Sequence, residues 1–228
     1  MSSHLSFVTT GDGSISIYNA SVGENYHSKH GALREAQHVF LKSGLQYFLE
    51  HHPVQEVRVL EVGLGTGLNF LLTADFCTEQ KITLDYTGIE AHPLPIAMIR
   101  QTGYGGYVTP EIWNSFLENY PESINQSTAI NPYCHLQTAH TPLDQFETTK
   151  RYDVLYFDAF AAIHQPEMWE FAALEHITRS LKPNGVFVTY AITGNLKRTM
   201  KALGFLIEKA PGAPGKREML RAVKMEQE

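Results

Sequence analysis

The stretch Val57–Asn69, which reads VRVLEVGLGTGLN, decides how the rest of this chain is interpreted. Residues 57–62 carry Val or Leu at four of six positions, which is typical of a buried strand. An apolar run from Leu68 to Cys77 then predicts a helix, so the glycine-rich segment connects a strand to a helix. Ligands of open α/β sheets bind at the carboxyl ends of strands, and this loop is therefore the first candidate binding site.

The same alternation of strands and helices continues toward the C-terminus. Further strands are expected at 82–90, 133–139, 152–157 and 186–191, with helices at 93–101, 111–119, 168–181 and 192–203. The sequence KPNG at 182–185 is a stop signal for the helix before it, and residues 121–131 are predicted to be a polar loop. Two last strands, 205–209 and 219–223, have no helix between them and should pair antiparallel. The pattern predicts the α/β class: a doubly wound, mainly parallel, seven-stranded sheet whose last strands are antiparallel.

The segment before this core has a different pattern. Residues 6–18 predict a β-hairpin with its turn at Asp12-Gly13, and residues 31–50 predict a helix that Gly44 could interrupt. We therefore expect one domain over residues 1–228, with an N-terminal hairpin-and-helix extension (1–50) and a Rossmann-like core (51–228).

Composition narrows the class of protein. The chain is 43% hydrophobic and has no apolar run of membrane-spanning length, and residues 1–6 lack the pattern of a secretory signal. Its two cysteines, Cys77 and Cys134, form neither a disulfide framework nor a zinc motif. No spacing of His, Cys and carboxylates predicts a metal site. We expect a cytoplasmic protein without a membrane segment or a metal.

The charges are unevenly distributed. The net charge is −6, but residues 195–224 hold eight Lys or Arg and only two Asp or Glu. Such a basic end can attract a polyanion locally, although a solvated helix face and strand edge would have the same composition.

The glycine spacing excludes two common nucleotide loops. Leu68 stands where a dinucleotide fingerprint needs Gly or Ala, and no Gly-Lys-Ser/Thr follows to make a P-loop. A ligand without a diphosphate remains, and Glu61 suits a cationic one. S-adenosylmethionine carries a sulfonium and an ammonium, so we expect it to contact Glu61, Gly63, Gly65, Gly67 and Asn69.

The next two strand ends complete the expected cofactor site. Glu90, followed by Ala91, can accept both ribose hydroxyls, as an acid does at this place in nucleotide folds. Thr138, Ala139 and His140 end the third strand, where the adenine should lie. His140 could equally be a polar loop residue.

The fourth strand end is the candidate reaction site. Asp158 can accept a hydrogen bond from a target amine and stabilise the charge that develops during methyl transfer. Phe160 could stack on a flat base. Trp169 is a candidate for the substrate pocket or for a core position, and Asp158 could also be only a helix cap.

Four groups of residues resemble one known family, the MnmC-type methyltransferase domain. They are Tyr26-His27-Ser28 with Gly31, Ala32, Glu35 and His38–Leu41; the loop Glu61–Asn69; Asp158-Ala159-Phe160 with Pro166–Trp169; and Pro211-Gly212 with Gly215–Met219. The resemblance covers nearly the whole chain in order. It implies that Tyr26 contacts the cofactor and that Lys216 and Arg217 contact the substrate.

The resemblance also implies a reaction: methylation of 5-aminomethyl-2-thiouridine to 5-methylaminomethyl-2-thiouridine at the wobble position of tRNA. Some members of that family carry a flavin-dependent oxidase domain, for which we see no counterpart here, so flavin is not expected. Two alternatives remain at this point. One is a small-molecule amine methyltransferase or aminopropyltransferase, and the other is a cofactor-binding protein without catalysis.

Overall fold

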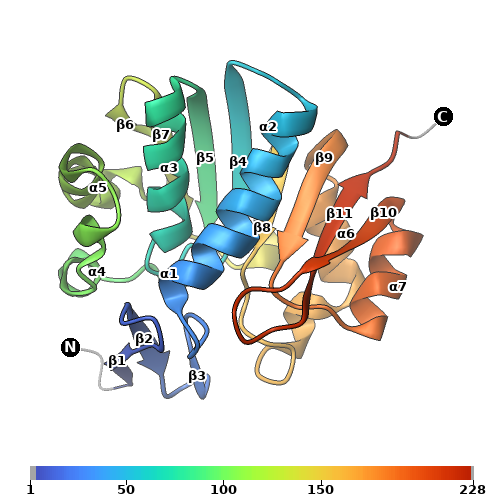
Figure 1. The fold of residues 1–228 in the computed structure, drawn as a ribbon, viewed down its shortest axis with the longest axis horizontal. Coiled ribbons are helices and arrows are strands. Elements are labelled where there is room, and N and C mark those ends of the chain that lie inside the picture. Colours follow the sequence, from blue (N-terminus) through green and yellow to red (C-terminus); the bar gives the residue numbers. More distant parts are fainter. Residues whose placement is uncertain (1–3, 227–228) are drawn as a thin grey trace.

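The computed structural model describes residues 4–226, and its centre is a mainly parallel sheet of eight strands (Figure 1). In spatial order these are β10 (Phe205–Pro211), β11 (Glu218–Lys224), β9 (Leu181–Thr189), β8 (Tyr152–Phe157), β4 (Glu56–Val62), β5 (Thr83–Ile89), β7 (Cys134–Ala139) and β6 (Thr128–Asn131). The strands from β9 to β7 run parallel, whereas β11 pairs antiparallel with both β10 and β9. The predicted fold class, including its antiparallel last pair, is confirmed.

The sheet has eight strands rather than the predicted seven, because residues 121–131 are not the polar loop that was expected. Helix α5 (Pro110–Ser123) continues through Pro121, and β6 then pairs antiparallel with β7. Pro121 lies in the last turn of the helix, so the N–H that it lacks removes one backbone hydrogen bond close to the helix end. In β6 only Ile130 is buried, so the strand forms by backbone pairing that apolar periodicity does not reveal.

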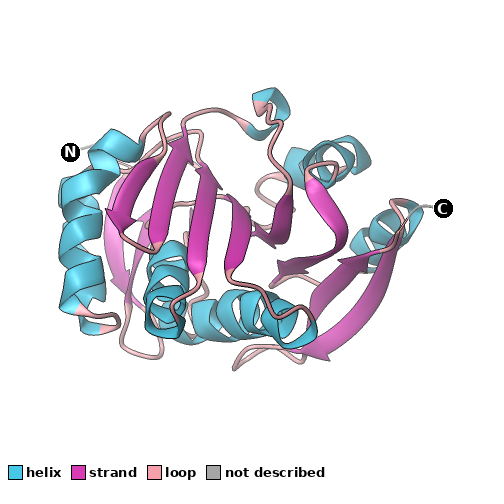
Figure 2. Cartoon of the chain, turned by 90° about the horizontal axis from the view of Figure 1, so that it is seen from above, coloured by secondary structure: helices cyan, strands magenta, loops and turns pink. Residues whose placement is uncertain are grey.

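Helices cover both faces of the sheet (Figure 2). One face carries a continuous helix made of α1 (Ala32–Glu35), a π-helical stretch (Ala36–Gln46) and α2 (Tyr47–His51), next to α3 (Leu68–Gln80) and α5. The short α4 (Ile96–Gln101) packs on α5. The other face carries α6 (Phe171–Thr178) and α7 (Gly194–Ala202). β8 is buried along its whole length, as expected of a strand at the centre of such a sandwich.

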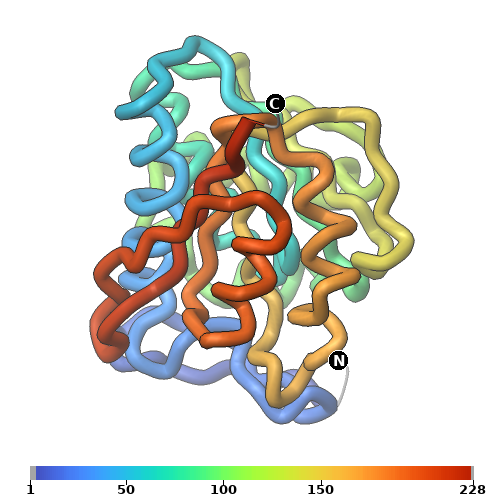
Figure 3. Tube along the Cα trace, turned by 90° about the vertical axis from the view of Figure 1, so that its right-hand side faces the viewer, coloured from blue at the N-terminus to red at the C-terminus, as the bar shows by residue number. Residues whose placement is uncertain are grey.

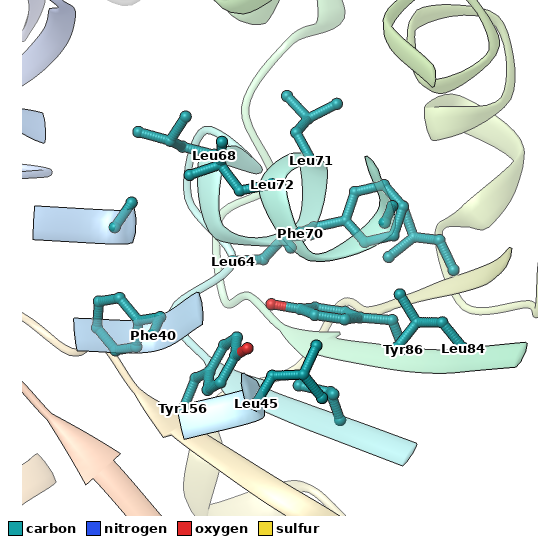
Figure 4. Packing of buried hydrophobic residues seen from close by; sticks show 14 of the residues in the cluster. Phe40, Leu45, Leu64, Leu68, Phe70, Leu71, Leu72, Leu84, Tyr86 and Tyr156 are labelled. Carbon is teal, nitrogen blue, oxygen red and sulfur yellow. The ribbon is translucent and has the colours of Figure 1, made fainter. Parts of the chain in front are cut away.

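Gly44 does not interrupt the first helix, which continues through it to His51. A Cβ atom at this position would lie 2.9 Å from both the Tyr156 ring and the Val188 side chain. Glycine therefore permits the close approach of the helix to β8 and β9, where a larger residue would force these side chains to shift. Figure 4 shows Phe40 of this helix beside Tyr156, with Leu68 and Phe70 of α3 in the same core layer.

The KPNG stretch does follow the end of a helix, but the helix is shorter than expected. Helix α6 ends at Thr178, and Leu181 already belongs to β9, paired with Tyr152. The next paired residues are Val154 and Val186, so residues 182–185 bulge out of the strand with Asn184 at a φ of 62°. A turn inside a strand and a helix stop use the same residue types, and sequence alone does not separate them.

The predicted N-terminal hairpin is present as β1 (Leu5–Thr9) and β2 (Ile15–Asn19), and the two-residue strand β3 (Glu24–Asn25) pairs with β2. This small sheet lies beneath the carboxyl edge of the main sheet, beside the segment after β8 and the loop between β10 and β11 (Figure 3). Glu24 accepts a hydrogen bond from the amide of Ala161 at 2.8 Å, and Gly215 lies against His30. The N-terminal extension thus covers the end of the sheet where a ligand would bind.

No helix within residues 4–226 combines the length and the apolar character needed to span a bilayer. Cys77 and Cys134 are buried and unbridged. In the same range, no three His, Cys or carboxylate side chains are grouped as metal ligands would be.

Candidate active site

Three carboxylates meet at the carboxyl edge of the sheet. Glu61 lies at the end of β4, and Glu90 and Asp158 directly follow the neighbouring strands β5 and β8. The Asn69 side-chain nitrogen donates to Glu61 Oε1 at 2.7 Å and to Asp158 Oδ2 at 2.8 Å. The amide of Gly65 donates to Glu90 Oε2 at 2.9 Å. The loop after β4 and the first turn of α3, which carries Asn69, therefore contact all three acids.

Glu61 is buried behind the loop rather than on a cavity wall. It is 1% exposed, and its second oxygen accepts a hydrogen bond from the Tyr86 hydroxyl at 2.7 Å. Burial, followed by the nearby charge of Asp158, raises the pKa of Glu61 well above its usual range. We expected Glu61 to face a cationic ligand directly, but the structure makes it the anchor of Asn69.

Asp158 is half-buried and borders two cavities. Burial, with a smaller contribution from Glu35, raises the pKa of its carboxyl to about 8, although Asn69 and Lys216 favour the charged form. An acid with a pKa near neutrality can exchange a proton with an amine.

The larger cavity has a volume of about 960 Å³ and lies along the loop after β4. It is bordered by nine residues that the sequence nominated: Tyr26, Gly63, Gly65, Asn69, Glu90, Ala91, His140, Asp158 and Phe160. Gly67 lies outside it as the N-cap of α3, at a φ of 77°, where a Cβ atom would meet the Phe116 ring at 2.7 Å.

Two loop glycines make room for protein atoms as well as for a ligand. A Cβ atom on Gly63 would lie 2.6 Å from the Asp158 carbonyl oxygen, and one on Gly65 would lie 2.9 Å from the Tyr26 ring. Both have positive φ, at 85° and 51°. These glycines let β8 and the N-terminal segment close around the cavity.

Of the three residues expected to contact the adenine, only His140 borders the larger cavity. The Thr138 hydroxyl is buried and lies 2.9 Å from Ser123 Oγ, and the Ala139 carbonyl accepts from the amides of Glu90 and Thr141. These two residues support the wall from behind. The wall itself is formed by His140 and the residues after it, including Leu143.

A smaller cavity of about 460 Å³ adjoins the first and shares Tyr26, His27, Asp158, Ala159 and Phe160 with it. Its other walls carry two more carboxylates, Glu24 and Glu35, and two lysines, Lys29 and Lys216. Lys216 Nζ lies 2.6 Å from Glu35 Oε2 and 4.1 Å above the centre of the Tyr190 ring. Asp158 and Phe160 therefore stand between a large cavity and a smaller one that is rich in carboxylates and aromatic rings.

The remaining nominated residues have different positions. Phe160 packs edge-on against Tyr26, with their ring centres 5.2 Å apart, at the junction of the cavities. Trp169 borders neither cavity: it is buried, packs on Phe157, and donates from its indole nitrogen to the Phe160 carbonyl at 2.8 Å. Its position supports Phe160 rather than a substrate contact. Arg217 is exposed beside Lys216 and contributes to neither cavity wall.

Several site residues were missed by the sequence reasoning. Glu24 and Glu35 come from the N-terminal extension, and Tyr86 reaches Glu61 from the middle of β5. His27 is half-buried between Ser16 Oγ at 2.9 Å and Thr66 Oγ1 at 3.3 Å, and desolvation lowers its pKa to about 4. The one sequence signal that could have indicated any of these missed residues was a polar side chain within a buried strand, as at Tyr86.

Comparison with known proteins identifies relatives that match most of this chain. The sequence profile of a family described as S-adenosyl-L-methionine-dependent methyltransferase matches residues 108–225. The bifunctional protein MnmC of Idiomarina loihiensis, named for tRNA 5-methylaminomethyl-2-thiouridine biosynthesis, is 30% identical over 86% of this chain and 34% of its own length. The protein of the same name from Magnetococcus marinus is 29% identical over 87% of this chain and 31% of its own. The chain thus spans about a third of these relatives.

Solved structures share the fold. MnmC2 from Aquifex aeolicus superimposes with a TM-score of 0.78 over 98% of this chain and 73% of that one, at 21% identity. The sugar N-methyltransferase KedS8 from Streptoalloteichus gives a TM-score of 0.51 over 85% of this chain and 87% of its own, at 13% identity.

Proposed function

Because the chain belongs to the family of S-adenosyl-L-methionine-dependent methyltransferases, we propose that it methylates the amine of 5-aminomethyl-2-thiouridine at the wobble position of tRNA. The product would be 5-methylaminomethyl-2-thiouridine. The observation that carries this proposal is the position of Asp158, between a cavity sized for the cofactor and a second cavity suited to an amine.

The larger cavity fits S-adenosyl-L-methionine. Its volume of about 960 Å³ is in the range of pockets that bury a ligand of that size. Glu90 offers carboxylate oxygens to the ribose, and Leu64, Ile89 and Leu143 supply apolar surface. Gly63 and Gly65 keep the loop free of side chains where the ligand would lie against it. When bound, the cofactor supplies an electrophilic methyl group on a sulfonium.

The smaller cavity supports an amine as the acceptor. Once Asp158 is ionised, the carboxylates of Glu24, Glu35 and Asp158 outnumber the two lysines there, so the cavity favours a positively charged group. Tyr26 and Phe160 at its junction with the larger cavity offer aromatic faces to a planar base.

Asp158 is the proposed catalytic residue. It would accept a hydrogen bond from the amine, hold the nitrogen toward the larger cavity, and take up the proton that nitrogen loses. With its pKa near 8 the carboxyl is largely protonated in the empty site at neutral pH, and cations in both cavities would lower that pKa and ionise it.

The proposed partner, tRNA, is supported by the names of the relatives and by exposed cations beside the smaller cavity. Lys29, Arg34 and Arg217 are exposed, and within residues 4–226 none of them forms an ion pair. The loop that carries Arg217 lies against residues 30–38. We call these three exposed cations the basic strip, and phosphates could bind along it while one nucleoside enters the smaller cavity.

The proposal is tested by nucleoside analysis of tRNA that contains 5-aminomethyl-2-thiouridine, after incubation with protein and labelled cofactor. We expect the methylaminomethyl nucleoside to form, and Asp158→Ala to lower its rate at least about 100-fold while cofactor binding persists. Full activity of Asp158→Ala would remove this residue from the mechanism. Methylation of free amines with no response to tRNA would favour a small-molecule methyltransferase instead.

A further inference from the structure

Four side chains form a continuous hydrogen-bonded chain from the core to the reaction site. The Tyr86 hydroxyl donates to Glu61 Oε2 at 2.7 Å. The Asn69 nitrogen donates to Glu61 Oε1 at 2.7 Å and to Asp158 Oδ2 at 2.8 Å. Tyr86, Glu61 and Asn69 are 0%, 1% and 4% exposed, so water does not compete for these bonds.

The chemistry of the donor groups determines which atom donates in each of these hydrogen bonds. An amide nitrogen only donates, and both of its hydrogens are used by the two carboxylates. Asn69 Oδ1 is buried and has no hydrogen-bond partner within the described residues. The opposite orientation of the amide would place this oxygen against two carboxylate oxygens. In the orientation that the structure shows, Glu61 Oε1 and Asp158 Oδ2 therefore both present lone pairs to Asn69.

The two oxygens of Asp158 consequently differ. Oδ2 is occupied by Asn69, whereas Oδ1 accepts no hydrogen bond from any residue in the range 4–226, although the side chain borders both cavities. A proton on this carboxyl is thereby directed to Oδ1, because Oδ2 is already an acceptor.

We propose that Asn69 and Tyr86 are positioning residues, which hold Glu61 and Asp158 so that a single oxygen of Asp158, Oδ1, meets the substrate amine. Asn69 was expected to be a cofactor contact, and this assigns it a role toward Asp158 instead. Tyr86 acts through Glu61 and borders neither cavity. The inference rests on the proposed transfer to an amine, and it adds to that proposal the residues that orient the acceptor.

Other charged or titratable groups also face Asp158 and contribute to its behaviour: Glu61 on β4, Glu24 on β3, Glu35 on α1, Tyr190 after β9 and Lys216 before β11. Glu24, Glu35, Tyr190 and Lys216 form no hydrogen bond with Asn69 or Tyr86, so their effect stays constant across the variants compared below. Glu61 accepts a hydrogen bond from each, and each bond lowers its pKa, so either substitution also raises the pKa of Glu61.

The first test is Asn69→Leu, which keeps a side chain of similar size but removes the donor. The charged form of Asp158 loses a hydrogen bond, so its pKa should rise and the acidic limb of the kcat–pH profile should move to higher pH. We expect kcat at pH 7 to fall at least roughly tenfold, with the Kd of the cofactor changed less than about threefold. A loss of cofactor affinity with kcat unchanged would instead make Asn69 a simple cofactor contact and overturn the proposal.

The second test is Tyr86→Phe, with Tyr156→Phe as its matched control. Both tyrosines are fully buried in adjacent parts of the core, with ring centres 6.3 Å apart (Figure 4), but the Tyr156 hydroxyl approaches Thr73 and lies outside the chain of hydrogen bonds. We expect kcat to fall in Tyr86→Phe and to stay near the wild-type value in Tyr156→Phe. Equal kcat values in the two variants would show that Tyr86 is only a core residue.

A third measurement does not depend on activity. The pKa of the Asp158 carboxyl, followed by ¹³C NMR and assigned with Asp158→Asn, should be higher in folded Asn69→Leu than in the wild type. An unchanged pKa would contradict the proposal even if no tRNA substrate were methylated. Absence of wild-type methylation would contradict the proposed function alone.

Discussion

At the scale of single residues, the site depends on carboxylates kept in places that disfavour their charge. Glu61 and Asp158 both have raised pKa values, and burial is the first cause for each. One amide, that of Asn69, serves both. Such an arrangement costs stability and is typical of sites built for a ligand or a reaction.

The pKa of Asp158 gives a prediction for stability against pH. Its folded value of about 8 lies above the ordinary 3.8, so between these pH values the folded state holds a proton that the unfolded state releases. The contribution of Asp158 to the free energy of unfolding therefore falls as pH rises from about 4 to 8. We expect Asp158→Asn to gain stability relative to the wild type across that window, as measured by urea denaturation at several pH values.

Asp144→Asn is the control, because it removes an exposed carboxylate from the border of the larger cavity. The same pH-dependent gain in both variants would mean that overall charge, rather than the site of Asp158, is responsible.

At the scale of elements, the first helix and β8–β9 depend on one close contact. Gly44→Ala would place a methyl group 2.9 Å from the Tyr156 ring and the Val188 side chain. We expect the free energy of unfolding to fall by about 1–2 kcal/mol, because overpacking costs more than the stability alanine adds to a helix interior.

The neighbouring Lys42→Ala, on the exposed side of the same helix, should change the free energy of unfolding by less than about 0.5 kcal/mol. Urea denaturation of both variants checks the prediction. A stabilised Gly44→Ala would show that the helix can move away from the sheet without cost.

At the scale of the whole molecule, a net charge of −6 coexists with a basic strip beside the smaller cavity. If tRNA phosphates bind there, Lys29→Gln with Arg217→Gln should raise the KM for tRNA at least about fivefold. The salt dependence of kcat/KM should also become shallower, by about one unit of slope for each phosphate that no longer meets a cation.

The matched control is Lys81→Gln with Arg151→Gln. These two exposed cations precede β5 and β8 and therefore lie at the amino edge of the sheet, opposite the cavities. Equal losses in both double variants would mean that total charge, and not the strip, governs the encounter with tRNA.

The sequence by itself determined the order of elements, the doubly wound sheet and the strand ends that carry chemistry. Buried strands have apolar runs, amphipathic helices have their own period, and carboxyl ends of neighbouring parallel strands must share one edge. Glu61, Glu90 and Asp158 could therefore be placed together before any coordinates. Strand β6 and the bulge at residues 182–185 could not, because backbone pairing and turn chemistry leave no distinctive periodicity.

Only the tertiary structure decided what each of these residues faces. Glu61 turned away from the cavity toward Tyr86, Trp169 packed behind Phe160, and Glu24 and Glu35 entered the site from a segment more than 100 residues away in sequence from Asp158. Side-chain direction and contacts between distant segments follow from how the layers pack. They cannot be predicted from the pattern of residues along the chain.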